Sequence, residues 1–312
     1  MKITLSQGDL AKALLSVAKS LTTRANLPIL TNVLLIASKD KLSVMATDLE
    51  TATQTVVSCQ VAVEGKVTVP GKVLTEFVSQ IPDGEIVVEK LGEELVVTAR
   101  GYSARFATMP PEDFPTIPKI EHGNVVKINA DELARAISKV AFSAAVDEGR
   151  PVLTGVLCEI SGEKFSMVAT DGYRLSFQRI PIVITAGGNL PIKIIVPAKA
   201  MIEASKLISE VFGEGEEGDI QIIVAEGLNQ MNIKIGSPRS PHGEAGGEAG
   251  MVEFTTRLIE GSFPPWQKII PDKFTSQIQA NREELVRLIR IASIFARDSG
   301  NIIKLTIGPK DG

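Results

Sequence analysis

The amino-acid sequence repeats itself, and this repeat limits the possible folds more than any other feature does. Positions 10–48 align without a gap on positions 133–171, and 17 of these 39 pairs are identical. The closing run of this alignment, Ala46–Asp48, falls on Ala169–Asp171. Self-similarity at this period indicates one supersecondary unit used more than once. We therefore expect at least two domains of the same fold.

The repeat continues at growing offsets. The pattern VPGK at 69–72 matches VPAK at 196–199, and Phe-Pro at 114–115 matches Phe-Pro at 263–264. The second copy thus holds about 22 extra residues, most of them in 236–250, which contains five Gly and two Pro. Such a composition cannot bury enough apolar surface to offset its ordering entropy. It predicts a flexible insertion between two strands, with a recognition tail as the alternative.

A third copy begins near Thr275. Each copy opens with a short strand followed by a helix, whose start is marked by a capping residue and an acidic residue three positions later. These pairs are Ser6 and Asp9, Asn129 and Glu132, and Asn281 and Glu284. Apolar residues then recur at helical spacing, so each helix is expected to bury one stripe. The chain ends at Gly312 after one strand, one helix and part of a hairpin, so we expect a C-terminally truncated chain.

The remaining pattern predicts hairpins and a second helix in each copy. Strand-like runs occupy 29–36, 41–47 and 55–63, a helix runs from about Pro70 to Gln80, and further strands follow at 85–89, 95–100 and 105–109. One copy therefore reads β-α-β-β-β-α-β-β-β, which favours antiparallel sheets covered on one face and an α+β fold. The predicted domains are 1–120, 125–271 and 272–312, the last incomplete.

Composition excludes several classes of protein. Two cysteines and two histidines are too few for a disulfide framework or a structural zinc site, so no metal is expected. Neither a P-loop nor a strand-linked G-x-G-x-x-G occurs, so no cofactor is expected. Neither His122 nor His242 lies in a segment that would hold it for proton transfer, which argues against an enzyme. No apolar run approaches a membrane span and no signal peptide is present, so a cytoplasmic location is expected.

Charge is distributed unevenly along the chain. The net charge is −4, yet the five predicted helical windows (8–24, 71–80, 131–143, 198–212 and 282–297) hold twelve Lys or Arg against eight Asp or Glu. Solvated helix faces explain this pattern in one interpretation. In the other, all helices lie on one side of a continuous sheet and present a mildly positive surface to a polyanion.

These features together resemble a known family. LPIL at 27–30, ATDLE at 46–50, VPGK at 69–72, VATDGYRL at 168–175 and FPPWQKIIP at 263–271 are similar to motifs of the bacterial sliding clamp, the β subunit of DNA polymerase III. The resemblance covers the whole chain. It implies a DNA-clamp fold with antiparallel sheets outside and helices lining a central channel, and a homodimeric ring, when full length, that encircles double-stranded DNA without reading its sequence. It also implies DNA-facing positions, which fall here on Arg24, Lys72, Arg150 and Lys199.

The resemblance further implies a hydrophobic groove in the second domain that binds short peptides of the replicative polymerase, the clamp loader and repair proteins. Tyr173 and Lys268 stand where the family often has His and Arg, which puts the polar details of recognition in question. Leu153 can also be read as plain core, because its partner Leu30 has no groove to line. The matching positions are Leu153, Thr170, Gly172, Tyr173, Arg174, Leu175, Pro264, Lys268 and Ile269.

Other functions remain as alternatives to the clamp. Asp48 and Asp171 can be imagined as paired carboxylates, but Asp-Gly at 171–172 favours a hairpin turn. A DNA-binding regulator would need a strongly basic recognition helix, and a nuclease would need clustered carboxylates for metal ions. The remaining alternative is a sequence-independent DNA-binding or scaffold protein that does not form a closed ring.

Overall fold

The computed structural model describes residues 1–22, 27–117, 120, 123–147, 149–186, 191–213, 218–225, 227, 229–236, 250–271, 273–297 and 300–306. The chain divides into two compact units, Met1–Phe263 and Pro264–Gly312. The first sequence copy, and the second copy as far as Phe263, lie in the first unit. The predicted insertion at 236–250 falls mostly outside the described residues.

The two copies have the same order of elements. The first contains β1 (Lys2–Ser6), α1 (Gln7–Val17), β2 (Asn32–Ser38), β3 (Lys41–Thr47), β4 (Thr51–Ser58), β5 (Gln60–Val63), β6 (Gly65–Pro70), α2 (Gly71–Gln80), β7 (Glu85–Leu91), β8 (Glu94–Ala99) and β9 (Tyr102–Ala107). The second contains β10 (Gly123–Asn129), α3 (Ala130–Val140), β11 (Gly155–Ser161), β12 (Lys164–Thr170), β13 (Leu175–Pro181), β14 (Val183–Ala186), β15 (Ile192–Pro197), α4 (Ala198–Phe212), β16 (Asp219–Ala225), β17 (Gln230–Ile235) and β18 (Val252–Arg257). The expected antiparallel α+β fold is confirmed.

The middle of each copy holds five strands where the sequence predicted three. The run predicted as one strand at 55–63 breaks at Cys59, whose N–H donates to the carbonyl of Asp40 at 3.0 Å. Before the break β4 pairs with β3, and after it β5 pairs with β1 in another sheet. The alternation of apolar and polar residues continues where the chain changes its partner strand, so the sequence pattern alone could not reveal the break at Cys59.

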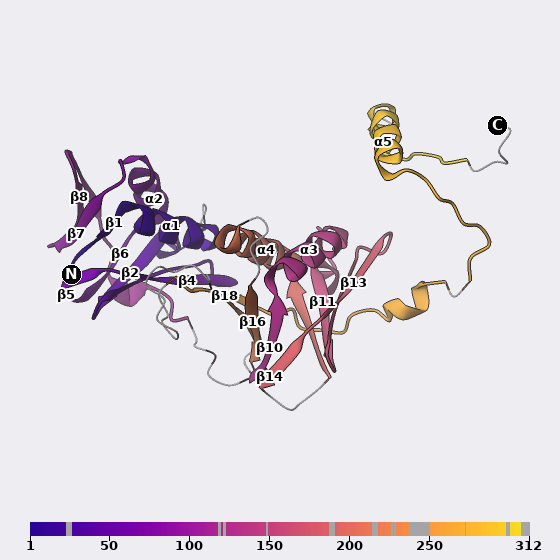
Figure 1. The fold of residues 1–312 in the computed structure, drawn as a ribbon, viewed down its shortest axis with the longest axis horizontal. Coiled ribbons are helices and arrows are strands. Elements are labelled where there is room, and N and C mark those ends of the chain that lie inside the picture. Colours follow the sequence, from indigo (N-terminus) through magenta and orange to yellow (C-terminus); the bar gives the residue numbers. More distant parts are fainter. Residues whose placement is uncertain are drawn as a thin grey trace. The chain divides into compact units, whose positions relative to one another are not determined.

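Three sheets build the first unit. The first copy contributes a five-stranded sheet, β5-β1-β7-β8-β9, and the second a four-stranded sheet, β13-β12-β11-β15. The remaining strands of both copies join in one nine-stranded sheet, β14-β10-β16-β17-β18-β4-β3-β2-β6 (Figure 1). Each copy keeps its own buried apolar core beneath its helices. Two similar domains therefore share a sheet and not a core.

The nine-stranded sheet is continuous because β18 pairs antiparallel with β4. In this register Phe254 lies opposite Thr53, which lies opposite Ala46 on β3. Phe254 belongs to the core of the second copy and Ala46 to that of the first, and all three are fully buried. Residues opposite one another point to the same face of a sheet. The helices α1 to α4 therefore cover one and the same face, as Figure 1 shows and as the second of the two interpretations of the helix charge required.

Polar contacts reinforce this join. Thr55 Oγ1 donates to the carbonyl of Met251 at 3.2 Å, and the Gly250 N–H donates to the carbonyl of Val56 at 2.8 Å. On the helix side Lys19 forms an ion pair with Glu210 of α4. Partial burial raises the pKa of nearby Glu203, and Asp48 of the first copy adds to this rise. The two copies thus contact each other through paired strands within the sheet and through charged residues on the helix side of the sheet.

The second unit differs from the expectation for a third copy. Helix α5 (Arg282–Ala296) is capped by Asn281, whose side chain accepts hydrogen bonds from the N–H groups of Glu283 and Glu284. The strand predicted near Thr275 is absent from the described residues of this unit. A strand needs a partner, and β10 in the second copy has two. Without a sheet to cover, the apolar face of α5 stays exposed, with Leu288 at 56%.

The capping residues Asn129 of α3 and Asn281 of α5 allow a test of whether α5, unlike α3, is packed against a core. Asn129 accepts from the Glu132 N–H at 3.0 Å at the start of the buried helix α3. Asn129→Ala should lower the free energy of unfolding by about 1 kcal/mol, because it leaves an amide of the first turn without its acceptor. Asn129→Asp should restore most of the loss. Urea denaturation followed by circular dichroism measures the effect.

The matched control is Asn281→Ala, which removes the same kind of cap from α5. Because α5 buries only Ala296 among its described residues, this change should not shift the main unfolding transition. An equal shift from both variants would show that α5 unfolds together with the first unit.

Candidate functional site

The turn that follows β12 is built around Thr170 and Asp171. Thr170 Oγ1 donates to the carbonyl of Arg174 at 2.7 Å and accepts from the Gly172 N–H at 3.1 Å. Asp171 Oδ1 accepts from the N–H groups of Tyr173 and Arg174 at 2.9 and 3.0 Å. Hydrogen bonds from the Arg174 and Tyr173 amides lower the pKa of Asp171. This carboxylate therefore organises a turn, as the sequence predicted.

The first copy forms the same turn after β3. Thr47 Oγ1 donates to the carbonyl of Thr51 at 2.8 Å, and Asp48 Oδ1 accepts from the Glu50 and Thr51 N–H groups. The left-handed position is Leu49, with φ +76°, where the second copy has Gly172, with φ +93°. A side chain at such a φ is strained, whereas glycine is not.

The turn in the second copy differs from the turn in the first copy in the side chains that it exposes. Tyr173 is 97% exposed, and the Arg174 guanidinium lies 5.6 Å from the ring centre of Phe142, itself 57% exposed. Arg174 Nε is also 2.9 Å from Asp171 Oδ2, so the guanidinium is held from two sides. Aromatic and Arg side chains of this kind are typical anchors of binding surfaces. The turn is thus a rigid support for one exposed aromatic side chain and one oriented guanidinium.

Arg150 lies beside this turn. Its Nη1 is 3.6 Å from the point that a Cβ on Gly172 would occupy. The Leu153 N–H donates to the carbonyl of Arg150 at 2.9 Å, so Leu153 follows one short helical turn later. Leu153 is 7% exposed. The sequence grouped Arg150 with the DNA-facing residues, and the structure brings it to the groove candidates.

The other groove candidates belong to the two units separately. Thr170 is buried and Leu175 is half-buried at the start of β13. In the second unit Pro264 is half-buried, while Lys268 and Ile269 are exposed in the short helix Trp266–Ile269. The first unit therefore brings together Arg150, Leu153 and the turn 170–175.

The DNA-facing candidates on helices occupy equivalent places. Lys72 and Lys199 are the second residues of α2 and α4, and both are exposed. Arg24 lies outside the described residues. The helices are less basic than the sequence windows suggested, because α1 to α4 contain six Lys or Arg and six Asp or Glu. The excess came from Lys19 and Arg24, beyond the end of α1, and from the window 282–297.

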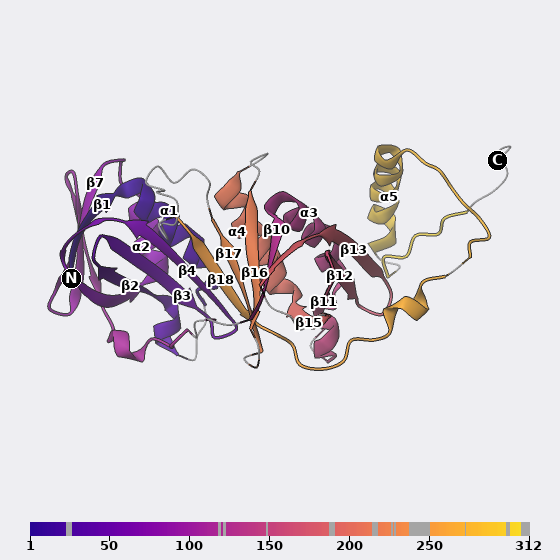
Figure 2. The same ribbon diagram turned by 60° about the horizontal axis from the view of Figure 1, so that its bottom comes forward.

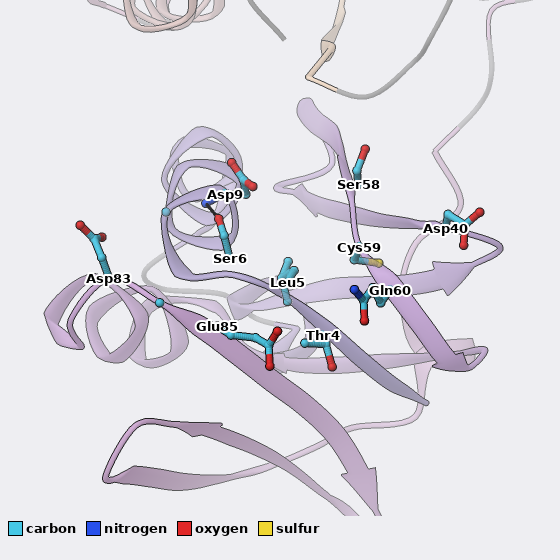
Figure 3. A pocket seen from close by; sticks show the side chains of 12 residues that line it. Thr4, Leu5, Ser6, Asp9, Asp40, Ser58, Cys59, Gln60, Asp83 and Glu85 are labelled. Carbon is cyan, nitrogen blue, oxygen red and sulfur yellow. Dashed lines mark hydrogen bonds between the residues drawn. The ribbon is translucent and has the colours of Figure 1, made fainter. Parts of the chain in front are cut away.

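A separate cavity of about 790 Å³ lies at the start of α1 (Figure 3). Ser6 and Asp9 stand on one side of it and Ser58, Cys59 and Gln60 on the other. The Asp9 N–H donates to Ser6 Oγ at 3.1 Å, so this hydroxyl serves as the helix cap. Burial, with a contribution from Asp40, raises the pKa of Cys59 to about 11, which keeps the thiol protonated and unreactive near neutral pH.

Residues that could form other kinds of site are also located. The described part of the chain contains no group of three His, Cys, Asp or Glu residues that could hold a metal ion. Burial raises the pKa of the second thiol, Cys158, still further. His122 and His242 lie outside the described residues. Within those residues, no helix is both long and apolar enough to cross a membrane.

The two turns allow the backbone strain to be measured. Gly172→Ala should lower the free energy of unfolding by about 1 kcal/mol, because a side chain in the left-handed region costs about 1–2 kcal/mol. Leu49→Gly should act in the opposite direction and raise it by up to about 0.5 kcal/mol, since glycine relieves that strain but is freer in the unfolded chain. Equilibrium denaturation of both variants checks this, and changes of the same sign would contradict it.

Comparison with known proteins agrees with this arrangement. Residues 1–118 match the family model "DNA polymerase III beta subunit, N-terminal domain", and residues 127–265 match "DNA polymerase III beta subunit, central domain". The beta sliding clamp of Vibrio cholerae is 30% identical over 98% of this chain and 78% of its own length. That of Caulobacter vibrioides is 30% identical over 99% and 79%.

Solved structures show the same fold. The DNA polymerase III subunit beta of Pseudomonas aeruginosa superposes with a TM-score of 0.82 at 27% identity, over 94% of this chain and 74% of that one. The sliding clamp of Bacillus subtilis superposes with a TM-score of 0.84 at 22% identity, over 96% and 75%. The repeated fold, its shared sheet and the two matched domains identify this chain as a member of the bacterial DNA polymerase III beta subunit family, the beta sliding clamps.

Proposed function

We propose that the protein is a processivity factor that encircles duplex DNA and tethers a replicative polymerase, and that it performs no catalysis. The observation that carries this proposal is the register of β18 on β4, which puts the helices of two successive copies on one face of one sheet. Adding further copies by the same pairing would extend a wall with helices on its inner side. Such a wall can hold DNA topologically without reading its sequence.

The ring itself is part of the proposal. We propose that the chain consists of domains 1–120, 125–271 and 272–312, and that a closed ring consists of two chains that each carry three complete copies of the fold. Both free edges needed for closure exist in the first unit, because β9 and β13 are terminal strands of their sheets. An unpaired edge strand is a template for another strand. No cofactor or metal enters the function, and the protein would act in the cytoplasm.

Contacts to DNA are expected to be few and weak. Helices α1 to α4 carry balanced charge, and two of their basic side chains are paired within a helix, Arg135 with Asp131 at 3.0 Å and Lys72 with Glu76 at 4.0 Å. Weak phosphate contacts suit sliding, since tight ones would hold the protein in place. We propose Lys72, Lys199 and Arg24 as DNA-facing, the last from the resemblance alone.

Retention on DNA tests the ring. Assembled from chains with a complete third copy and loaded onto nicked circular DNA, the protein should remain bound in salt that strips ordinary phosphate binders, and should escape when the circle is cut. Lys72→Ala with Lys199→Ala should reduce the salt dependence of initial binding, by about 0.9 in log–log slope for each lost contact. Gel filtration of labelled DNA complexes measures both quantities.

The matched control is Lys41→Ala with Lys164→Ala, at the first residues of the equivalent strands β3 and β12 and on no helix. This control should load normally. A scaffold that does not close a ring would leave circular and linear DNA at equal rates, and that result would refute the clamp proposal.

For partner binding we propose a groove that includes the turn 170–175, Leu153 and Arg150. Exposed Tyr173, the Arg174 guanidinium over Phe142, and Arg150 beside Gly172 support this choice. The equivalent turn of the first copy carries Glu50 and Thr51 in place of Tyr173 and Arg174, so only the second copy offers such anchors. For Pro264, Lys268 and Ile269 the proposal rests on the resemblance alone. The ligand would be a short peptide of a replicative polymerase, a clamp loader or a repair protein.

Peptide binding tests the groove. Tyr173→Ala and Arg150→Ala should each weaken the binding of a fluorescent clamp-binding peptide from the organism's replicative polymerase by about tenfold, because Tyr and Arg are frequent hot spots. Glu50→Ala, at the position equivalent to Tyr173, is the control and should leave the affinity unchanged. Fluorescence anisotropy provides the measurement. Full affinity in both groove variants would show that the peptide binds elsewhere.

A further inference from the structure

The face of the nine-stranded sheet opposite the helices holds a cavity of about 720 Å³ where the two copies join. Strands β16, β17, β18, β4, β3 and β2 follow one another in this part of the sheet (Figure 2). Pro111, Phe114, Pro115, Thr116, Ile117 and Ile120, which follow β9 in the sequence, also line it. We call this space the seam cavity. Its lining residues that matter below are Leu34, Met45, Ala52, Gln54, Lys66, Phe114, Ile223, Asn232, Lys234, Glu253 and Thr255.

The floor of the seam cavity consists of two rows of opposed side chains that cross the join. One row runs from Ile223 through Asn232 and Thr255 to Ala52. The other runs through Lys234, Glu253, Gln54, Met45 and Leu34. These residues alternate with those of the cores, so they point away from the helices. A molecule over the centre of this floor would therefore contact both β4 and β18.

Most of the lining residues are apolar, but polar groups contribute as much of the exposed lining as apolar groups do, and the charged lining residues Lys66, Lys234 and Glu253 are paired. Leu34 packs with Phe114 in a small buried cluster outside the main cores. Lys66 Nζ is 2.8 Å from Glu112 Oε1, and Lys234 Nζ is 3.4 Å from Glu253 Oε1. An ionic ligand would have to compete with these pairs. The cavity is thus suited to an uncharged molecule, and its volume lies in the range of small-molecule sites.

One buried polar atom of a lining residue lacks a partner. Asn232 is 5% exposed, and its Nδ2 donates to Thr255 Oγ1 at 2.9 Å. Its Oδ1 is buried and accepts no hydrogen bond. A buried carbonyl oxygen without a donor is costly, so natural proteins rarely keep one without a reason. An apolar side chain of the same size would avoid that cost here.

We propose that the seam cavity binds a compact, uncharged molecule with an apolar or aromatic body and one N–H or O–H group, which donates to Asn232 Oδ1 once a small rotation of this side chain opens the oxygen to the cavity. The apolar body lies over Met45, Ala52 and Leu34, and the donor is the group that the site selects. The bound molecule spans the β4–β18 join and so stabilises the contact between the two copies. This site is separate from the groove at 170–175 and does not depend on it.

Indole and 1-methylindole form a matched pair of probes, since they differ in the N–H group. Titration of the 312-residue chain, followed by calorimetry or ligand-observed NMR, should show saturable one-to-one binding of indole with Kd about 1 mM, as expected for so small a ligand. 1-Methylindole should bind about five- to tenfold more weakly, because it cannot donate to Asn232. Failure of indole to saturate below about 10 mM would overturn the proposal.

Variants locate the binding. Asn232→Leu keeps the side-chain size but removes the acceptor, so it should bind the two probes within about twofold of each other. Ala52→Trp should fill the floor and abolish binding of both. Asn124→Leu is the control, because Asn124 is a similarly buried asparagine of β10 that does not line the cavity. A preference for indole that survives in Asn232→Leu, or binding that survives in Ala52→Trp, would show that the probe binds elsewhere.

Discussion

The pairing of β18 with β4 is the interaction on which the arrangement of the first unit depends. It joins strands that lie almost 200 residues apart in the sequence, and it puts Phe254 and Ala46 in one row with Thr53 between them. A slip of one residue would turn every side chain of β18 to the other face. The core of the second copy would then face away from its own helices. The register is therefore specified by both cores at once, and two separately packed domains share one continuous sheet.

The sequence predicted those parts of the fold that are local or repeated. Helix starts could be located because Ser6, Asn129 and Asn281 combine a cap with an acidic residue, and all three accept the predicted amide hydrogen bonds. The break at Cys59 could not be predicted, because it depends on which strand is the neighbour. The strand near Thr275 was predicted by analogy with β10, whose extended form depends on β14 and β16. Analogy between copies fails where the tertiary partners are missing.

In the candidate site, too, the local features could be predicted from the sequence and the features that depend on tertiary contacts could not. The turn 170–175 follows from its own residues, because Thr170 and Asp171 supply the acceptors that close it, just as Thr47 and Asp48 do. The position of Arg150 does not follow from any local pattern. It comes next to Gly172 because β11 and β12 pair, which brings the segment before β11 to the end of β12. The comparison between the copies offered one sequence signal that the second turn differs from the first: it has Gly172 where the first copy has the strained Leu49.

Duplication explains why different surfaces of this chain can serve different purposes. The proposed ring needs a continuous helix face that is alike in the copies, and Lys72 and Lys199 occupy the same place in α2 and α4. The turns after β3 and β12 are free to differ, because each needs only its Thr and Asp to keep its shape. The face opposite the helices is free to differ for another reason. Neither core reaches it, so a polar residue such as Asn232 can be kept there without disturbing the packing that holds the register of β18 on β4.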